Sequence, residues 1–436
     1  MSSVLNDKAT YAKIIRKKTR VKADYMYVLG VLSTFIILFN FKLGGVALSK
    51  FIMLGFSIYI CWRNRGRLRK SVYKLEYIPY FLITIVSVLL ILGGDSPYKE
   101  YSVRSLVDFL FILILCLTVA TCNNEKIRSF FIGVRVSCYV QIIWCFLQIV
   151  FWYILHIDIN KMLFVDGFHL IENASKYNSD GVLCISGLSH HPSNLIVVII
   201  FTLFLVNKAW KWPVCIAIAI ASRNSTTLIA IVFCMILYLI PSIRNFFKKK
   251  KFNRKGLLFL LITLAVLVAF TFMGGNVIVT RISEILLRIQ SAYNGTAYDG
   301  STIAHASYYT FLPQVWEKFS LAEKLFGYSY GWTGGMFSYF FGAQYSLIFT
   351  RPSLNWGVES DPMNLIYGIG IIGAVTFYWW LSRTAIKGIK INNQYFIMIV
   401  SLIIAGIFYC IQYSMVIVIE VLLTVAVFRK MDVFIE

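Results

Sequence analysis

The stretch GVESDPMNLIYGIGIIGAVTFYWW, residues 357–380, decides the fold class of this protein. Two carboxylates, Glu359 and Asp361, stand directly before an apolar run that is long enough to cross a bilayer as a helix. Pro362 lies at the junction, and glycines follow inside the run at positions 368, 370 and 373. The pattern predicts a membrane-spanning helix that carries two acids at its amino-terminal end.

Apolar runs of this kind recur along all 436 residues, and apolar residues make up 58% of the sequence. Soluble globular domains contain about 45–50%. Because lipid cannot satisfy backbone N–H and C=O groups, runs of this length are expected to be α-helices. We therefore predict an all-α, polytopic membrane protein in which residues 1–436 form a single integral membrane domain.

The sequence predicts about twelve spans, each of roughly membrane-crossing length. They cover residues 25–41, 46–62, 77–93, 105–122, 131–156, 193–207, 212–222, 225–241, 256–274, 363–382, 394–412 and 414–428. Basic residues cluster in the short segments between spans, as in RNRGRLRK (63–70) and RNFFKKKKFNRK (244–255). Since such clusters stay in the cytoplasm, we expect both termini there. This distribution explains the net charge of +22 without a nucleic-acid partner and favours contact with the lipid bilayer.

Two long segments fall on the predicted outer side, a first large loop over 157–192 and a second over 275–362. Long loops are usually functional. The second loop contains YSYGWTGGMFSYFFGAQY (328–345), which is rich in aromatic residues and glycine. Such a segment is typical of an aromatic belt in the headgroup region, and it would equally suit stacking on sugar rings.

The polar candidates gather in these outer segments, whereas Arg135 and Glu420 are the main charged residues expected inside spans. His191 precedes Pro192, which is expected to begin the next helix as a first-turn proline. This histidine is therefore placed at the membrane boundary, either as an ordinary hydrogen-bonded loop residue or as a base or phosphate ligand. His305 lies in the second loop.

Four arginines are predicted on the outer side. Arg281 and Arg288 are seven residues apart and share a face if their segment is helical. Arg351 follows later in the second loop, and Arg223 lies in the tight turn ASRNSTT (221–227). Guanidinium groups bind phosphate oxygens in pairs and stay charged. These arginines would suit a lipid-linked pyrophosphate, and headgroup contacts or salt bridges within the loops are the alternative.

The acids of the opening stretch have different expected roles. Asp361 before Pro362 is typical of a helix N-cap, where the helix dipole favours negative charge. Glu359 is less easily explained as a cap and is free to point into a cleft. The glycines allow another helix to approach closely, which would hold the acids on a well-packed helix. The nine cysteines show no CxxC spacing, so we expect neither a disulfide framework nor a metal site.

Four segments resemble, in family order, the O-antigen polymerase/ligase superfamily, above all its Wzy-type polymerases. They are SGLSHHPSNLIVVII (186–200), ASRNSTTLIAIVF (221–233), LAEKLFGYSYG (321–331) and ESDPMNLIYGIGIIGAVTFY (359–378). The predicted layout of about twelve spans and two large periplasmic loops is also similar to that family. The chain departs from the family in having VLCIS where an arginine commonly precedes the glycine at 187. It also has Ser360 and Asp361 where many members have His–Asn.

The resemblance implies glycosyl transfer at the periplasmic face of the bacterial inner membrane. A growing glycan on undecaprenyl pyrophosphate is passed to the terminal hydroxyl of another lipid-linked repeat unit, without a cofactor. A chain-length-determining co-polymerase is the implied protein partner. The residues expected at the pyrophosphate are Arg223, Arg281, Arg288 and Arg351. The expected base is, in order, Glu359, His305 or His191, with Asp361 as the second acid framing the site.

Two other functions stay open at this point. A ligase that transfers finished glycan to a lipid A core sugar shares the chemistry and differs in its acceptor. A flippase or other transporter of lipid-linked sugars would carry more charged residues within its spans and smaller outer loops.

Overall fold

The structure is a computed structural model in which the described residues are mostly helical. It describes residues 23–35, 42–43, 46–64, 76–95, 97, 99–169, 175–177, 181–189, 191–208, 210–224, 227–228, 230–238, 309, 312–333, 335–336, 339–340, 358–411 and 414–434. The predicted span 256–274 and most of the second large loop lie outside these ranges. The helical class of the prediction is confirmed for the part that is described.

Among the described residues, three helices are long and apolar enough to cross a membrane: α6 (Lys99–Val119), α7 (Asn124–Leu155) and α17 (Asp361–Ile389). The shorter apolar helices are α5 (Ile78–Gly93), α8 (Leu195–Leu205), α9 (Lys211–Ala221), α18 (Asn393–Phe408) and α19 (Ser414–Phe428). Other helical elements are α2 (Tyr25–Leu32), α4 (Leu48–Arg63), α14 (Leu312–Lys318), α15 (Leu321–Phe326), the π-helix η2 (Lys161–Gly167) and the 3-10 helix η3 (Pro192–Asn194). Two antiparallel hairpins pair β1 (Lys42–Leu43) with β2 (Val46–Ala47) and β3 (Lys176–Tyr177) with β4 (Leu183–Cys184).

Several helices differ in length from the predicted spans. Helices α8 and α9 have 11 residues each, which corresponds to about 16 Å, roughly half of a bilayer core. The predicted span 25–41 begins as α2, but this helix ends at Leu32. Apolar runs identify segments that avoid water, and they do not distinguish a membrane-crossing helix from a short helix inside the protein. The count of about twelve spans therefore stays a prediction.

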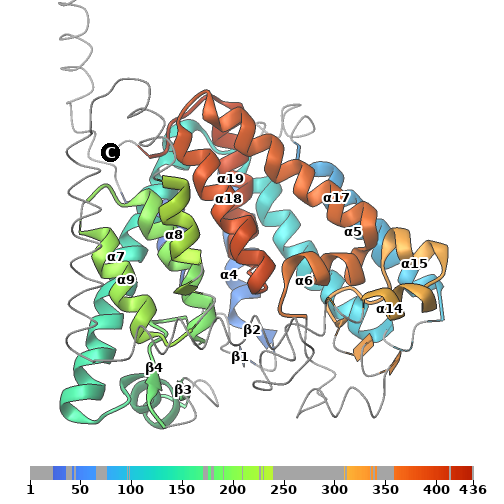
Figure 1. The fold of residues 1–436 in the computed structure, drawn as a ribbon. Helices are drawn as coiled ribbons and strands as arrows, with labels where there is room; N and C mark the ends of the chain where they lie inside the picture. Colours follow the sequence, from blue (N-terminus) through green and yellow to red (C-terminus); the bar gives the residue numbers. More distant parts are fainter. Residues whose placement is uncertain are drawn as a thin grey trace, which may run out of the picture.

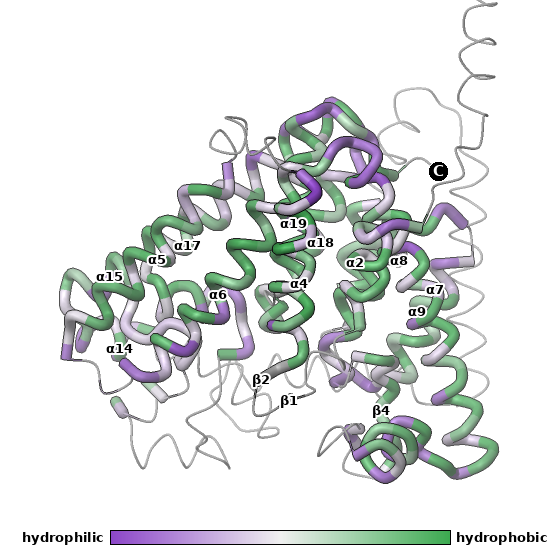
Figure 2. Tube along the Cα trace, turned by 180° about the vertical axis from the view of Figure 1, so that it is seen from behind, coloured by the Kyte–Doolittle hydropathy of each residue, from purple (hydrophilic) through white to green (hydrophobic). Residues whose placement is uncertain are grey.

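The helices pack as one bundle in which α7, α8 and α9 lie on one side and α5, α17 and α15 on the other (Figure 1). Helices α18 and α19 lie between these groups, and α17 packs against both α18 and α5. Every residue of α8 is buried. Figure 2 shows that the helix bodies are largely hydrophobic and that hydrophilic residues concentrate in the turns. This distribution, together with the long apolar helices, indicates a membrane protein.

Helix α17 consists of two segments joined at Gly370, whose φ of 72° and ψ of −177° are not helical. A Cβ at this position would clash with the backbone of Leu325 and Phe326 in α15. The predicted close approach of another helix is thus confirmed at Gly370. At Gly373 the atoms nearest to an added Cβ belong to Ile369 of the same helix, so a close approach of another helix stays a prediction there. The unbroken span expected from the sequence is replaced by a bent helix because α15 occupies the space beside the break.

The turns between helices gather at two opposite ends of the bundle. We call one the charged end; Arg429 there donates a hydrogen bond to the carbonyl of Ala120 (2.8 Å), and Lys126 pairs with Asp24 (2.6 Å). We call the other the loop end; it contains the described residues within 158–194, 221–224, 309–333, 358–364 and 407–411. The loop end holds described parts of both predicted large loops.

Candidate functional site

His191 stands where the first large loop enters the bundle. Its backbone is extended, and its Nδ1 accepts a hydrogen bond from the Ser193 N–H (3.3 Å), so it caps η3. Pro192 occupies the first position of that element, which confirms the predicted helix start. The loop histidine expected from the sequence is therefore first of all a structural cap.

The His191 ring also contacts two further segments, β3 and the residue that follows α18. Its Nε2 lies 3.2 Å from the Nζ of Lys176 in β3. Its ring stacks on Tyr409, which directly follows α18, with centroids 6.1 Å apart and planes inclined by 2°. The imidazole is half-exposed, and imidazole groups commonly serve as proton donors and acceptors in catalysis.

The Arg223 turn packs against the same segment. Asn224 donates a side-chain hydrogen bond to the Ser193 hydroxyl (2.7 Å) and accepts one from the Thr227 N–H (3.0 Å). Arg223 itself has a φ of 53°, in the left-handed region that is uncommon for residues other than glycine. Backbone of this kind persists where the surroundings impose it, and it clusters at functional sites. The structure thus places Arg223 one residue from a contact with the His191 segment.

Asp361 has a different role from the predicted N-cap. The cap position of α17 is Ser360, and Asp361 is the first helical residue, with only 2% of its surface exposed. Its carboxylate accepts a hydrogen bond from the Ile411 N–H (3.0 Å), beyond the end of α18. It lies against Gly406, where a Cβ would clash with it. The N-cap prediction is wrong because the side chain reaches across to α18 and holds the segment that carries Tyr409.

Glu359 lies near this same segment and is half-buried. Burial, together with the negative charge of Glu359, raises the pKa of the Tyr409 hydroxyl. The adjacent Ser360 hydroxyl forms a hydrogen bond with the Tyr309 hydroxyl (2.7 Å), which also donates to the carbonyl of Ile407 (2.8 Å). Glu359 is thus close enough to act electrostatically on Tyr409, and the His191 ring stacks on Tyr409.

The described part of the aromatic loop is packed onto helices. The N–H of Tyr328 donates to the carbonyl of Tyr367 in α17 (2.9 Å). The rings of Tyr330 and Trp332 lie on Phe109 (5.8 Å) and Tyr101 (4.4 Å) of α6. These ring contacts fix this part of the second loop to α6. Only tertiary contacts could reveal this role. A headgroup belt and a sugar platform both stay predictions for the segment 328–345.

Charged residues inside the helices include a pair that the sequence analysis missed. Lys50 of α4 forms an ion pair with Asp108 of α6. Arg135, one of the expected exceptions, donates to the carbonyl of Val433 (2.6 Å), and Glu420 is buried in α19. Lys50 and Asp108 therefore have to be added to Arg135 and Glu420 as charged residues within the predicted spans.

The structure brings together four of the predicted site residues at the loop end: Arg223, His191, Glu359 and Asp361. The others lie outside the described residues: His305, Arg281, Arg288 and Arg351. Within the described part of the chain, no group of three or more His, Cys, Asp or Glu side chains is placed to hold a metal ion.

Sequence reasoning missed the residues that join these segments, namely Tyr409, Ser193, Asn224 and Lys176. Tyr409 was expected inside a span over 394–412, but α18 ends at Phe408 and Tyr409 is extended. The pattern of apolar residues contains no signal for the end of α18 at Phe408, because Tyr409, Cys410 and Ile411 are also apolar. No family model and no curated protein matches the chain.

Proposed function

We propose that this protein polymerises undecaprenyl-pyrophosphate-linked oligosaccharide repeat units into a surface polysaccharide, by glycosyl transfer at the loop end. One observation carries the proposal: segments around His191, Arg223 and Glu359, distant in sequence, converge on Tyr409 and Ser193. The convergence brings together the segments that carry a cation, a carboxylate and an imidazole, which is the set of groups that this transfer needs.

In the proposed reaction the acceptor hydroxyl attacks the anomeric carbon of the donor glycan. The bond from that carbon to the pyrophosphate oxygen breaks, and the hydroxyl proton passes to a base. Glu359 is the first candidate for this base and His191 the second. Arg223 stabilises the leaving lipid pyrophosphate, together with Arg281, Arg288 and Arg351 from the second loop. Asp361 serves as a positioning residue, since it is buried against the backbone of Ile411.

The proposal includes the membrane arrangement. About twelve spans would cross the bacterial inner membrane, with the loop end in the periplasm and both termini in the cytoplasm. The basic turns at the charged end support this orientation. A chain-length-determining co-polymerase would be the protein partner.

The test is complementation of cells that lack this gene, with surface polysaccharide resolved on a gel. We expect Arg223→Ala and Glu359→Gln to reduce the ladder to core plus one repeat unit. Arg128→Ala is the matched control, because Arg128 is exposed at the charged end. Membrane expression of each variant is checked first.

Other outcomes would overturn parts of the proposal. Loss of all polysaccharide from the core, with long lipid-linked chains accumulating, would identify a ligase. Lipid-linked repeats retained in the cytoplasmic leaflet would identify a transporter. A normal ladder in both variants would remove Arg223 and Glu359 from the site.

A further inference from the structure

A groove of about 420 Å³ lies between α2 and α4, away from the loop-end site. Its lining residues are Tyr25, Val28, Phe51, Ile52, Gly55, Phe56 and Tyr59. Helix α2, one wall of the groove, packs along α7, and helix α4, the other wall, packs along α6. Val28 and Phe51 are 45% and 50% exposed, which means that the groove opens toward the surroundings of the bundle.

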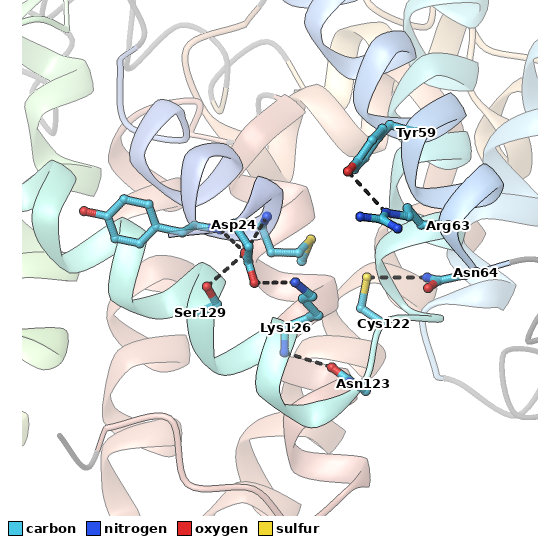
Figure 3. A network of polar contacts seen from close by, with 10 residues as sticks. Asp24, Tyr59, Arg63, Asn64, Cys122, Asn123, Lys126 and Ser129 are labelled. Atoms are coloured by element: carbon cyan, nitrogen blue, oxygen red, sulfur yellow. Dashed lines mark hydrogen bonds and ion pairs between the residues drawn. The ribbon is translucent and has the colours of Figure 1, made fainter. Parts of the chain in front are cut away.

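Two lining tyrosines, Tyr25 and Tyr59, form one part of the groove that we call the tyrosine end, and cations flank them. The rings of Tyr25 and Tyr59 are in edge contact, with centroids 5.1 Å apart. The Nζ of Lys126 lies 4.7 Å from the Tyr25 ring, and the guanidinium of Arg63 lies 5.9 Å from the Tyr59 ring. Figure 3 shows Arg63 beside Tyr59, whose hydroxyl accepts a hydrogen bond from the Arg63 Nε (3.3 Å).

The two cations differ in how they are neutralised. Lys126 is paired with Asp24, which also accepts a hydrogen bond from Ser129 (Figure 3). Arg63 is exposed, and within the described part of the chain it has no carboxylate partner. It also begins the basic stretch RNRGRLRK (63–70). The tyrosine end of the groove therefore carries the positive charge of Arg63 without a matching anion among the described residues.

We propose that this groove binds one anionic glycerophospholipid, with an acyl chain between α2 and α4 and the phosphate at Arg63. Apolar walls match an acyl chain and exclude a polar ligand, and the groove volume is typical of ligand sites, about 300–1,000 Å³. An arginine binds phosphate oxygens in pairs. Gly55 keeps the groove open, since a Cβ added there meets nothing within 4 Å.

The experiment uses the full chain reconstituted in phosphatidylcholine vesicles. These contain a small fraction of phosphatidylglycerol with a photoactivatable acyl chain, and labelled peptides are mapped by mass spectrometry. We expect labelling in 25–32 and 51–59, stronger than with the same probe on phosphatidylcholine. Gly55→Leu should lower it severalfold by filling the groove. Gly93→Leu is the matched control, because a Cβ there also meets nothing within 4 Å and α5 does not line the groove.

A second variant tests the charge. Arg63→Gln should reduce the preference for phosphatidylglycerol about fivefold, the contribution of one basic residue near a membrane surface, and Arg63→Lys should retain part of it. Equal elution of all variants on a sizing column establishes that they are folded. Labelling that Gly55→Leu leaves unchanged, or equal labelling by both lipids, would overturn the proposal. Competition by inorganic phosphate, or cross-links showing another chain segment or a second copy in the groove, would do so as well.

Discussion

The charged end and the loop end use polar residues in different ways. At the charged end Lys126 pairs with Asp24, Lys387 pairs with Glu76, and Arg429 donates to the carbonyl of Ala120. These charged side chains tie helix ends together through ion pairs and through hydrogen bonds to carbonyl groups. At the loop end the contacts between segments are made by amides, hydroxyls and rings, as between Asn224 and Ser193.

This difference separates stabilising charges from charges that a ligand can use. Among the described residues, Arg223 has no carboxylate partner, whereas Arg429 is half-buried against carbonyl groups. Replacing arginine with alanine should therefore reduce polymer formation at the loop end (Arg223) and reduce stability at the charged end (Arg429).

The largest expected effect is that of Arg223→Ala on polymer formation. Removing one group that stabilises charge in a transition state typically lowers turnover about 10²–10³-fold. Because Arg223 is half-exposed and outside the packed core, thermal unfolding in detergent should be unchanged. The measurement is polymer formed per unit of membrane-inserted protein. A loss of polymer matched by a loss of thermal stability would contradict a ligand-binding role.

Gly370→Ala should be the most damaging change to the fold where α15 packs on α17. The new Cβ would face strain at a φ of 72° and a clash with the backbone of α15. We expect a loss of about 2–5 kcal/mol from these two effects. Thermal unfolding measures it, with Gly93→Ala as a control where a Cβ meets nothing within 4 Å. Equal stability of the two variants would show that α15 does not pack at the break.

Arg429→Ala tests the charged end. It leaves the carbonyl groups of Ala120 and Cys122 without their guanidinium donor. A hydrogen bond from a charged group contributes about 1.5–3 kcal/mol, so thermal stability should fall by this order. The amount of polysaccharide per folded molecule should stay normal, in contrast to Arg223→Ala. Arg128→Ala is the control, because Arg128 is exposed. A selective loss of polymer in Arg429→Ala would contradict a purely stabilising role of Arg429.

The smallest effect concerns pH. Burial alone would raise the pKa of the Asp24 carboxyl, but hydrogen bonds from Lys126, the Tyr27 N–H and Ser129 outweigh burial and lower it. A pKa lowered by folding gives stability that is fully present above the ordinary value of 3.8 and is lost as the pH falls through the folded value. For a partly exposed pair we expect about 0.2–1 kcal/mol.

The measurement for Asp24 is thermal unfolding as a function of pH. Asp24→Asn should remove this part of the acid sensitivity and leave the stability at low pH unchanged. An identical pH dependence in the variant and in the wild type would show that the Asp24–Lys126 pair does not contribute.

The sequence by itself determined which segments avoid water and where several helices begin. The predicted spans 77–93, 105–122 and 131–156 correspond to α5, α6 and α7 within a few residues, apart from earlier starts of α6 and α7. Pro192 marked a helix start correctly. These features follow from local properties, namely the length of an apolar run and the conformational restriction of proline. The polar candidates Arg223, His191 and Glu359 were likewise visible as residue types at the edges of apolar runs.

Tertiary structure decided what those residues contact. The bend at Gly370, the reach of Asp361 to Ile411 and the stacking of His191 on Tyr409 join segments that are far apart in the chain. Hydropathy carries no information about such pairs, because an apolar run indicates that a segment avoids water and does not indicate which segment it packs against. Packing selected the partners, since each contact depends on the space that the neighbouring helices leave.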